Sequence, residues 1–169
     1  LSRYRQLALN EIKAERNSKM FETIREVSNA WSTANDEALS YSDVTGEDET
    51  LGNLLERIYA SLERDQYIDF SLMIRLAVEE LERNSPAINQ ALNGVRHILV
   101  DEYQDVNPMQ ERLIRQLSER ADSLMVVGDD DQSIYAWRGA DVNNILSFQE
   151  RYPQSSVHIL STNFRSTAA

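Results

Sequence analysis

The sequence contains no cysteine, which excludes disulfide bonds and thiolate metal sites. No run approaches the roughly 18 consecutive apolar residues that a membrane-spanning helix requires. The first five residues also lack the apolar stretch of a secretory signal. We therefore expect a soluble protein of a reducing compartment, and place it in the cytoplasm.

Lysine is scarce, and this excludes one kind of nucleotide site. A phosphate-binding loop needs Gly-x-x-x-x-Gly-Lys-Ser/Thr, whose backbone amides and lysine hold the phosphates. The chain has only two lysines, Lys13 and Lys19, and neither lies in such a loop. The chain also starts with leucine and ends abruptly on Ser-Thr-Ala-Ala. We expect it to be a piece of a longer protein that carries an incomplete site.

Basic charge is in short supply, with 17 Lys and Arg against 28 Asp and Glu and a formal net charge of −11. This balance argues against non-specific duplex binding through a broad basic face. Much of the acidity is local, because residues 36–50 hold six carboxylates and no basic residue. Such a stretch is typical of a solvated linker or surface excursion, so a narrower contact with nucleic acid remains compatible with the charge.

The first half of the chain has the apolar spacing of helices. Three stripes recur at this spacing, namely Met20-Ile24-Val27-Trp31, Leu51-Leu54/Leu55-Ile58-Leu62 and Phe70-Met73/Ile74-Ala77-Leu81. The third ends near Asn84-Ser85-Pro86, where a helix is expected to stop. We interpret all three stripes as packing faces and assign them no chemistry.

The second half alternates short apolar runs with helical segments. The runs at 97–100, 124–127 and 157–160 each lead directly into polar residues. Asn107 and Pro108 have the chemistry of an N-cap and a first turn before a helix over 109–121, and a second helix is expected over 142–151. This alternation predicts a parallel sheet covered on both faces, with ligands at the carboxyl ends of the strands.

Carboxylates follow the first two runs. Asp101 and Glu102 leave the first run together, so one can hold a divalent cation while the other faces a reacting water, although the pair alone is weak evidence. Asp129, Asp130 and Asp131 follow the second run and need a cation or backbone donors as partners. A calcium loop starting at Asp129 fails, because its sixth and twelfth positions are isoleucine and alanine.

Aromatic and basic residues complete the pattern. Tyr135, Trp137 and Arg138 offer flat stacking surfaces beside a cation, which is the chemistry of single-strand grips, although Trp137 alone could be a buried aromatic. Arg165 follows the third run and can reach phosphate oxygens, although in isolation a surface salt bridge would be the simpler interpretation.

Together these segments resemble the UvrD/Rep-type helicases of superfamily one. The segment Ile98-Leu99-Val100-Asp101-Glu102-Tyr103-Gln104-Asp105 resembles that family's Walker B motif. Residues 126–140 match the following motif almost letter for letter, and residues 160–167 resemble the next one. The specific resemblance covers residues 97–167, and a looser one, including Asp69-Phe70-Ser71-Leu72, covers 66–96.

The resemblance implies an α/β fold, an incomplete RecA-like parallel sheet of the P-loop NTPase type with a mainly helical N-terminal half. Residues 1–65 would form a helical region of an inserted subdomain, and residues 66–169 the C-terminal part of the first RecA-like ATPase domain. The parent protein would be an ATP-dependent DNA helicase that uses ATP and Mg²⁺ and binds single-stranded DNA. The isolated chain, without its phosphate loop, would be unable to run an ATP cycle.

The resemblance also implies a role for each ATP-site residue. Asp101 would help to hold Mg²⁺, and Glu102, a second candidate metal ligand, would be the general base. Gln132 would sense the γ-phosphate and link nucleotide state to the grip on DNA. Arg165 would contact the γ-phosphate, and Phe164 would stack near the adenine, although the family usually has tyrosine there and so a hydroxyl hydrogen bond is lost.

The remaining motif residues are implied to contact DNA or to support the site. Tyr135, Trp137 and Arg138 would lie toward the single strand, with Trp137 stacking on a base. Gln104 and Asp129 would support the network rather than react.

Absence of the phosphate-loop strand would leave a gap in the sheet, with exposed strand edges. We expect strand rearrangement, a second protein segment or self-association to fill this gap. A clean monomer in size-exclusion chromatography, together with an unbroken sheet, would contradict this expectation.

Two other functions stay open. One is a non-catalytic relative that serves as an interaction module, which a full-length protein without a phosphate-binding loop would favour. The other is a carboxylate-metal nuclease built on Asp101, Glu102 and the three aspartates at 129–131. The nuclease hypothesis leaves Gln132, Trp137 and Arg165 unexplained.

Overall fold

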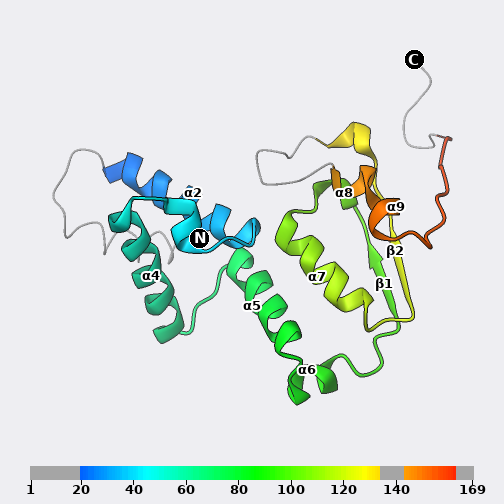
Figure 1. The fold of residues 1–169 in the computed structure, drawn as a ribbon, viewed down its shortest axis with the longest axis horizontal. Coiled ribbons are helices and arrows are strands. Elements are labelled where there is room, and N and C mark those ends of the chain that lie inside the picture. Colours follow the sequence, from blue (N-terminus) through cyan, green and yellow to red (C-terminus); the bar gives the residue numbers. More distant parts are fainter. Residues whose placement is uncertain (1–19, 134–142, 163–169) are drawn as a thin grey trace.

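The structure, a computed structural model, describes residues 20–133 and 143–162. Its elements are α2 (Met20–Asp36), α3 (Tyr41–Thr45), α4 (Glu49–Arg64), α5 (Phe70–Arg83), α6 (Pro86–Ala91), β1 (His97–Val100), the 3₁₀ helix η1 (Tyr103–Asp105), α7 (Pro108–Ser118), β2 (Ser123–Val126), the 3₁₀ helix η2 (Asp130–Gln132), α8 (Asn143–Leu146) and α9 (Phe148–Arg151). Helices α2 and α4 lie on one side, β1, β2 and α7 on the other, and α5 lies between them (Figure 1).

Helix ends follow the capping chemistry of the sequence. Asn107 caps α7, since its side chain accepts a hydrogen bond from the Gln110 N–H while the Gln110 side chain bonds back to the Asn107 N–H. Asn84 ends α5 in the left-handed conformation, and Ser85 then caps α6. The predicted helix boundaries at Asn84 and Asn107 are confirmed, although α7 ends at Ser118 rather than at residue 121.

Trp31 lies at the centre of the helical half, with only 1% of its surface exposed, so its prediction as a core aromatic is confirmed. Its ring stacks on Tyr41, with centroids 5.7 Å apart. Its Nε1–H donates to Oδ2 of Asp69 over 2.7 Å. The surrounding cluster of buried residues comes from α2, α4 and α5 and contains Val27, Ala30, Trp31, Leu55, Ile58, Leu62 and Leu72.

The third apolar stripe was only partly right. Its member Leu81 is buried, whereas Phe70 is 85% exposed and Met73 is 41% exposed. Leu72 and Val78, which lie outside the stripe, are buried instead. The hydrogen bond between Trp31 and Asp69 holds the first turn of α5 so that Leu72 faces the core. The buried face of α5 then packs against α2 and α7.

The acidic stretch at 36–50 is largely a surface excursion, as expected, and it contains α3. Ser40 caps this short helix, and the Asp43 side chain accepts a hydrogen bond from the Ser40 N–H over 3.2 Å. Among the described residues, no helix is both long enough and apolar enough to cross a bilayer.

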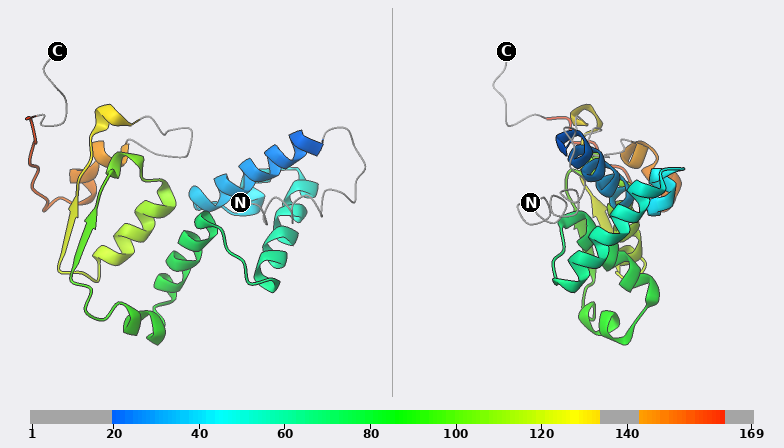
Figure 2. Two further views of the ribbon diagram at one scale, coloured as in Figure 1. Left: turned by 180° about the vertical axis from the view of Figure 1, so that it is seen from behind. Right: turned by 90° about the vertical axis from the view of Figure 1, so that its left-hand side faces the viewer.

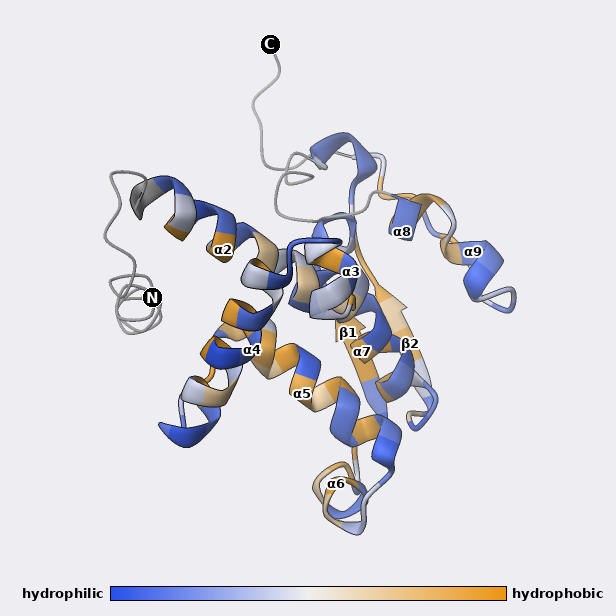
Figure 3. Ribbon diagram, turned by 60° about the vertical axis from the view of Figure 1, so that its left-hand side comes forward, coloured by the Kyte–Doolittle hydropathy of each residue, from blue (hydrophilic) through white to orange (hydrophobic). Residues whose placement is uncertain are grey.

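Strands β1 and β2 form a parallel pair in which His97 is opposite Ser123 and Val100 is opposite Val126. Helix α7 covers one face of this pair (Figure 2). The other face is open in the described part of the chain, where Leu99 is 73% and Met125 is 57% exposed. Figure 3 shows how apolar both strands are. The α/β class is confirmed, whereas the expectation that both faces would be covered is wrong for these residues.

The third predicted strand, at 157–160, does not form. These residues have no regular structure, and Ile159 and Leu160 are 85% and 86% exposed. An extended segment becomes a strand only when a neighbour satisfies its backbone groups, and neither β1 nor β2 pairs with this one. The helix expected over 142–151 is instead two short helices, α8 and α9, separated by Ser147.

Asp69 joins two parts of the helical core, because it accepts the Trp31 hydrogen bond through Oδ2 and caps α5 through Oδ1 to the Leu72 N–H at 2.8 Å. Replacing Asp69 by alanine should lower the free energy of unfolding by about 2–3 kcal/mol. Asp48→Ala is the matched control, because the Asp48 side chain caps α4 at the Leu51 N–H. Its cost should be about 1 kcal/mol. Equal losses in urea denaturation would contradict the bridging role of Asp69.

Asp36, at the end of α2, should make stability depend on pH. Desolvation raises the pKa of its carboxyl above the ordinary 3.8, and hydrogen bonds with Ser71 and Asn107 only partly oppose this. Ionisation of Asp36 therefore opposes folding, and this cost appears as pH rises from about 3.8 through the raised pKa. Asp36→Asn should be more stable than the unsubstituted chain at pH 7, and the difference should vanish near pH 3.

Asp43→Asn is a control of opposite sign. Side-chain and backbone hydrogen bonds with Ser40 lower the pKa of Asp43. Its ionised form therefore stabilises the fold above the ordinary carboxyl pKa, and this contribution is lost as pH falls through the lowered one. The Asn variant should consequently be the less stable form at neutral pH. Parallel urea titrations in which both variants shift the same way would contradict this assignment.

Candidate functional site

The loops that follow β1 and β2 lie side by side because backbone pairing continues past the ends of the strands. The Val127 N–H donates to the Val100 carbonyl over 2.8 Å, and the Tyr103 N–H donates to the Val127 carbonyl over 3.0 Å. These two bonds place Asp101 and Glu102, after β1, next to the segment that begins at Gly128.

Glu102 has a left-handed backbone, with φ 52° and ψ 43°. A residue with a side chain pays about 1–2 kcal/mol for this conformation, and such strain gathers at functional sites. The Glu102 N–H donates to Oδ1 of Asp101 over 2.9 Å. Both carboxylates are exposed to solvent, at the carboxyl end of a parallel strand.

Gln104 connects the two loops from a buried position, with only 1% of its surface exposed. Its Nε2 donates to Oε2 of Glu102 over 2.7 Å, and its Oε1 accepts from the Asp129 N–H over 3.0 Å. Only this orientation of the amide gives the carboxylate a donor and the N–H an acceptor. Gln104 therefore links the two loops, and its implied supporting role stays a prediction.

Asp129 extends the same network to Gln132. Its Oδ2 accepts from Nε2 of Gln132 over 2.5 Å, and its Oδ1 accepts from the Asp131 N–H over 3.1 Å. A continuous hydrogen-bonded chain thus runs from Glu102 through Gln104 and Asp129 to Gln132. Of the two partners considered for the three aspartates, a cation or backbone donors, Asp129 has a backbone donor and the Gln132 amide.

A small core beneath η1 holds this chain in place. Tyr103 is fully buried, packs edge-on against Phe148 with centroids 5.4 Å apart, and donates through its hydroxyl to Oε2 of Glu111 over 2.5 Å. Burial, followed by the bond to Glu111, raises the pKa of the Tyr103 hydroxyl far above its ordinary value, so this hydroxyl stays a donor. Asn144 of α8 adds a buried hydrogen bond to the Val106 carbonyl over 2.9 Å.

The sequence did not indicate the importance of Gly128. A Cβ atom at this position would lie 2.8 Å from Oε1 of Gln104 and 3.2 Å from the Tyr103 nitrogen. The glycine is therefore needed for the close approach of the two loops. Its only sequence signal was its place between a buried apolar run and an aspartate.

Two carboxylates offer ligands for a metal. Within residues 20–133 and 143–162, no group of three or more His, Cys, Asp or Glu side chains is arranged to hold an ion. Asp101 and Glu102 still suit Mg²⁺, which commonly takes one or two carboxylates and completes its shell with phosphate oxygens and water. The local chemistry thus fits a metal that arrives with a phosphorylated ligand.

Several predicted site residues lie outside the part of the chain that is described, namely Tyr135, Trp137, Arg138, Phe164 and Arg165. Of the predicted residues, the structure brings together Asp101, Glu102 and Gln132. The assignments of the others stay predictions.

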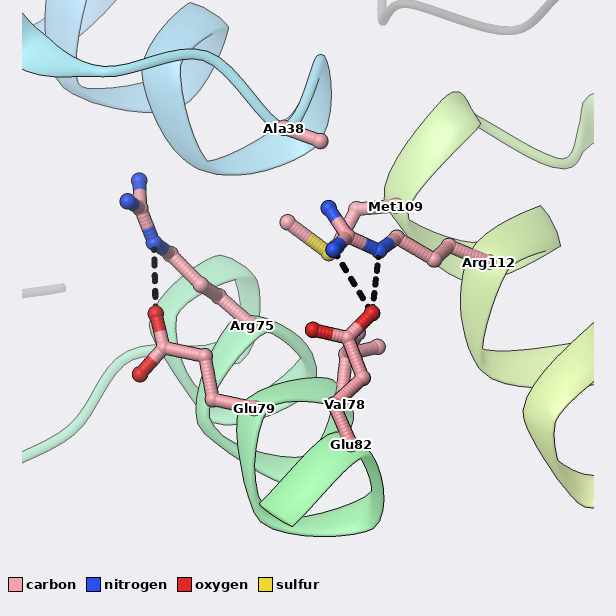
Figure 4. Close-up of a pocket in the computed structure, with 7 residues that line it drawn as sticks. All are labelled: Ala38, Arg75, Val78, Glu79, Glu82, Met109 and Arg112. Carbon is pink, nitrogen blue, oxygen red and sulfur yellow. Dashed lines mark hydrogen bonds and ion pairs between the residues drawn. The ribbon is translucent and has the colours of Figure 1, made fainter.

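A cavity of about 240 Å³ lies elsewhere, between α5, α7 and Ala38. Arg75 pairs with Glu79 over 3.2 Å, and Arg112 pairs with Glu82 over 2.6 Å, at its rim (Figure 4). The charged groups that line it neutralise one another, and it contains none of the predicted site residues. We regard it as packing space between the two halves of the fold.

Comparison with known proteins covers most of the chain. The family model described as "UvrD/REP helicase N-terminal domain" matches residues 3–153. The protein "ATP-dependent DNA helicase PcrA" of Bacillus subtilis is 42% identical over 120 residues, which are 71% of this chain and 16% of that protein. Its namesake in Staphylococcus epidermidis is 44% identical over 106 residues, which are 63% of this chain and 14% of that protein. The chain therefore spans about a sixth of the length of these relatives.

Proposed function

The chain belongs to the UvrD/REP helicase N-terminal domain family, and we propose that it supplies part of the ATP-hydrolysis site and of the single-strand contact of an ATP-dependent DNA helicase or translocase. The observation that carries this proposal is the hydrogen-bonded chain from Glu102 to Gln132 at the carboxyl ends of two parallel strands. Open α/β sheets bind their ligands at this edge. The names of the PcrA relatives point to the same activity.

Each ATP-site residue has a proposed task. Asp101 and Glu102 would hold Mg²⁺, which would supply charge neutralisation for the phosphates. Glu102 also accepts the proton of the attacking water, and its exposed carboxylate is accessible for this step. Gln132 and Arg165 contact the γ-phosphate, and Phe164 stacks near the adenine.

The single-strand contact is proposed for Tyr135, Trp137 and Arg138. Aromatic rings stack on bases of any sequence, and an arginine beside them adds attraction to the backbone phosphates. The three residues follow η2 in the sequence, and η2 carries Gln132. The ATP site and the strand contact are therefore separated by only a few residues of chain.

The proposed domain division assigns residues 1–65 to a helical region of an inserted subdomain and residues 66–169 to the first RecA-like domain. The chain as given lacks a phosphate-binding loop, so we propose that it is inactive by itself and that turnover belongs to the longer protein. Self-association through exposed sheet edges stays a prediction for the isolated chain.

Replacing Glu102 by glutamine in the full-length protein should lower ATP turnover with single-stranded DNA by about 100-fold or more, because the general base is removed while the side chain keeps its size. Binding of a fluorescent ATP analogue should persist. Glu119→Gln, at an exposed carboxylate just past the end of α7, is the matched control and should keep wild-type turnover.

Wild-type turnover in Glu102→Gln would contradict the assigned base. Mg²⁺-dependent cutting of DNA without ATP would instead support the nuclease alternative. A full-length protein without a phosphate-binding loop that fails to hydrolyse ATP would support the interaction module.

Trp137→Ala in the same protein should weaken binding of a fluorescent oligothymidine by about tenfold, since one stacked base contributes about 1–3 kcal/mol. Trp137→Phe keeps a ring for stacking and should recover most of the affinity. Fluorescence anisotropy measures both constants. Equal affinity of the alanine variant and the wild type would remove Trp137 from the DNA contact.

A further inference from the structure

We propose that Gln104 is a positioning residue for ATP hydrolysis. Its buried amide fixes the position of the Glu102 carboxylate relative to the loop that carries Gln132. This inference rests on the proposed function and assigns to Gln104 a task beyond filling the core. It acts through Glu102 and makes no contact with the nucleotide itself.

Both the nitrogen and the oxygen of the Gln104 amide form hydrogen bonds. The amide nitrogen donates to the Glu102 carboxylate over 2.7 Å, and the amide oxygen accepts from the Asp129 N–H over 3.0 Å. The amide is almost fully buried, whereas Glu102 is exposed. A hydrogen bond from a buried amide is stronger and less variable than one formed with water. Gln104 therefore restricts the orientation of the exposed Glu102 side chain through a buried hydrogen bond.

Glu102 needs such confinement. A glutamate side chain on the surface has several accessible rotamers, and restricting them costs conformational entropy. In the described part of the chain, Gln104 is the one side chain that donates to the Glu102 carboxylate. Without it, the carboxylate would sample orientations that do not face an attacking water, and displacement by about 1 Å can cost about 100-fold in rate.

The position of the amide is itself set by the second loop. Gly128 leaves no room for a side chain here, since an added Cβ would lie 2.8 Å from Oε1 of Gln104 and equally close to Cδ1 of Ile145. The next residue, Asp129, binds that same oxygen through its N–H and binds Gln132 through its carboxylate. A displacement of the loop that carries Gln132 would therefore be transmitted through Gln104 to Glu102.

A purely structural role would have a different signature. If Gln104 only satisfied the Asp129 N–H, its loss would reduce the amount of folded protein and leave the turnover of each folded molecule unchanged. A positioning role lowers kcat of the folded enzyme while KM for ATP stays close to wild type, because the interaction matters in the transition state and not in nucleotide binding.

The test is Gln104→Met in the full-length protein, since methionine has the same length and cannot make either hydrogen bond. With saturating single-stranded DNA, kcat should fall by about tenfold or more and KM for ATP should stay within about twofold. Active-site titration with a tight-binding ATP analogue corrects the rate for the folded fraction.

Asn35→Ala is the matched control. Asn35 is also a buried amide, with 0% exposure, and its Nδ2 donates to the Trp31 carbonyl over 2.8 Å in the helical half, without contacting Glu102. It should lower the melting temperature as Gln104→Met does and keep kcat for each active site. Wild-type kcat in Gln104→Met, or an equal fall of kcat in both variants, would overturn the proposal.

Gly128→Ala keeps the Gln104 amide but places a methyl group 2.8 Å from its Oε1 and from Cδ1 of Ile145. The amide must then move, so this variant should also lower kcat and serves if Gln104→Met fails to fold. A Gly128→Ala enzyme that folds and turns over like wild type would then overturn the inference.

Wild type and Glu102→Gln are assayed alongside, to separate failure of the proposed function from failure of the positioning role. If wild type does not hydrolyse ATP, or Glu102→Gln matches it, the proposed function fails. If those two behave as expected and only the Gln104 effect is absent, the positioning role alone fails.

Discussion

Two backbone hydrogen bonds beyond the ends of β1 and β2 determine the geometry of the candidate site. The parallel register places Val100 opposite Val126, and the bonds from Val127 to Val100 and from Tyr103 to Val127 continue the pairing into both loops. Parallel strands put their carboxyl ends at one edge, so the loops after β1 and β2 lie side by side. Glu102 and Gln132 join one hydrogen-bonded chain because of this register.

The strained backbone at Glu102 is compatible with this arrangement because the surroundings hold it in place. The residue lies between the exposed Asp101 and the fully buried Tyr103, and its side chain is bonded to a buried amide. Beneath it, Tyr103 packs against Phe148 and is hydrogen-bonded to Glu111. A strained residue supported in this way is held in a defined orientation.

Much of the local structure could be predicted from the sequence. The helix boundaries at Asn84 and Asn107 were predictable because capping depends on a few neighbouring residues. Trp31 in the core and the strand at 97–100 followed from the apolar pattern, and the run predicted at 124–127 forms a strand at 123–126. The exposed Phe70 and the missing strand at 157–160 were not predictable, because rotation of a helix and pairing of a strand depend on partners elsewhere in the chain.

The sequence by itself determined the family, because its motifs are contiguous blocks whose residue types and order can be read without a structure. It also determined which residues were candidates for chemistry, including Asp101, Glu102 and Gln132. Only the tertiary structure decided how the candidates are connected. The path from Glu102 through Gln104 to Asp129 crosses between two loops, and the need for Gly128 arises from a contact of 2.8 Å with a side chain 24 positions earlier. Such contacts depend on strand register and burial, which are properties of the folded chain.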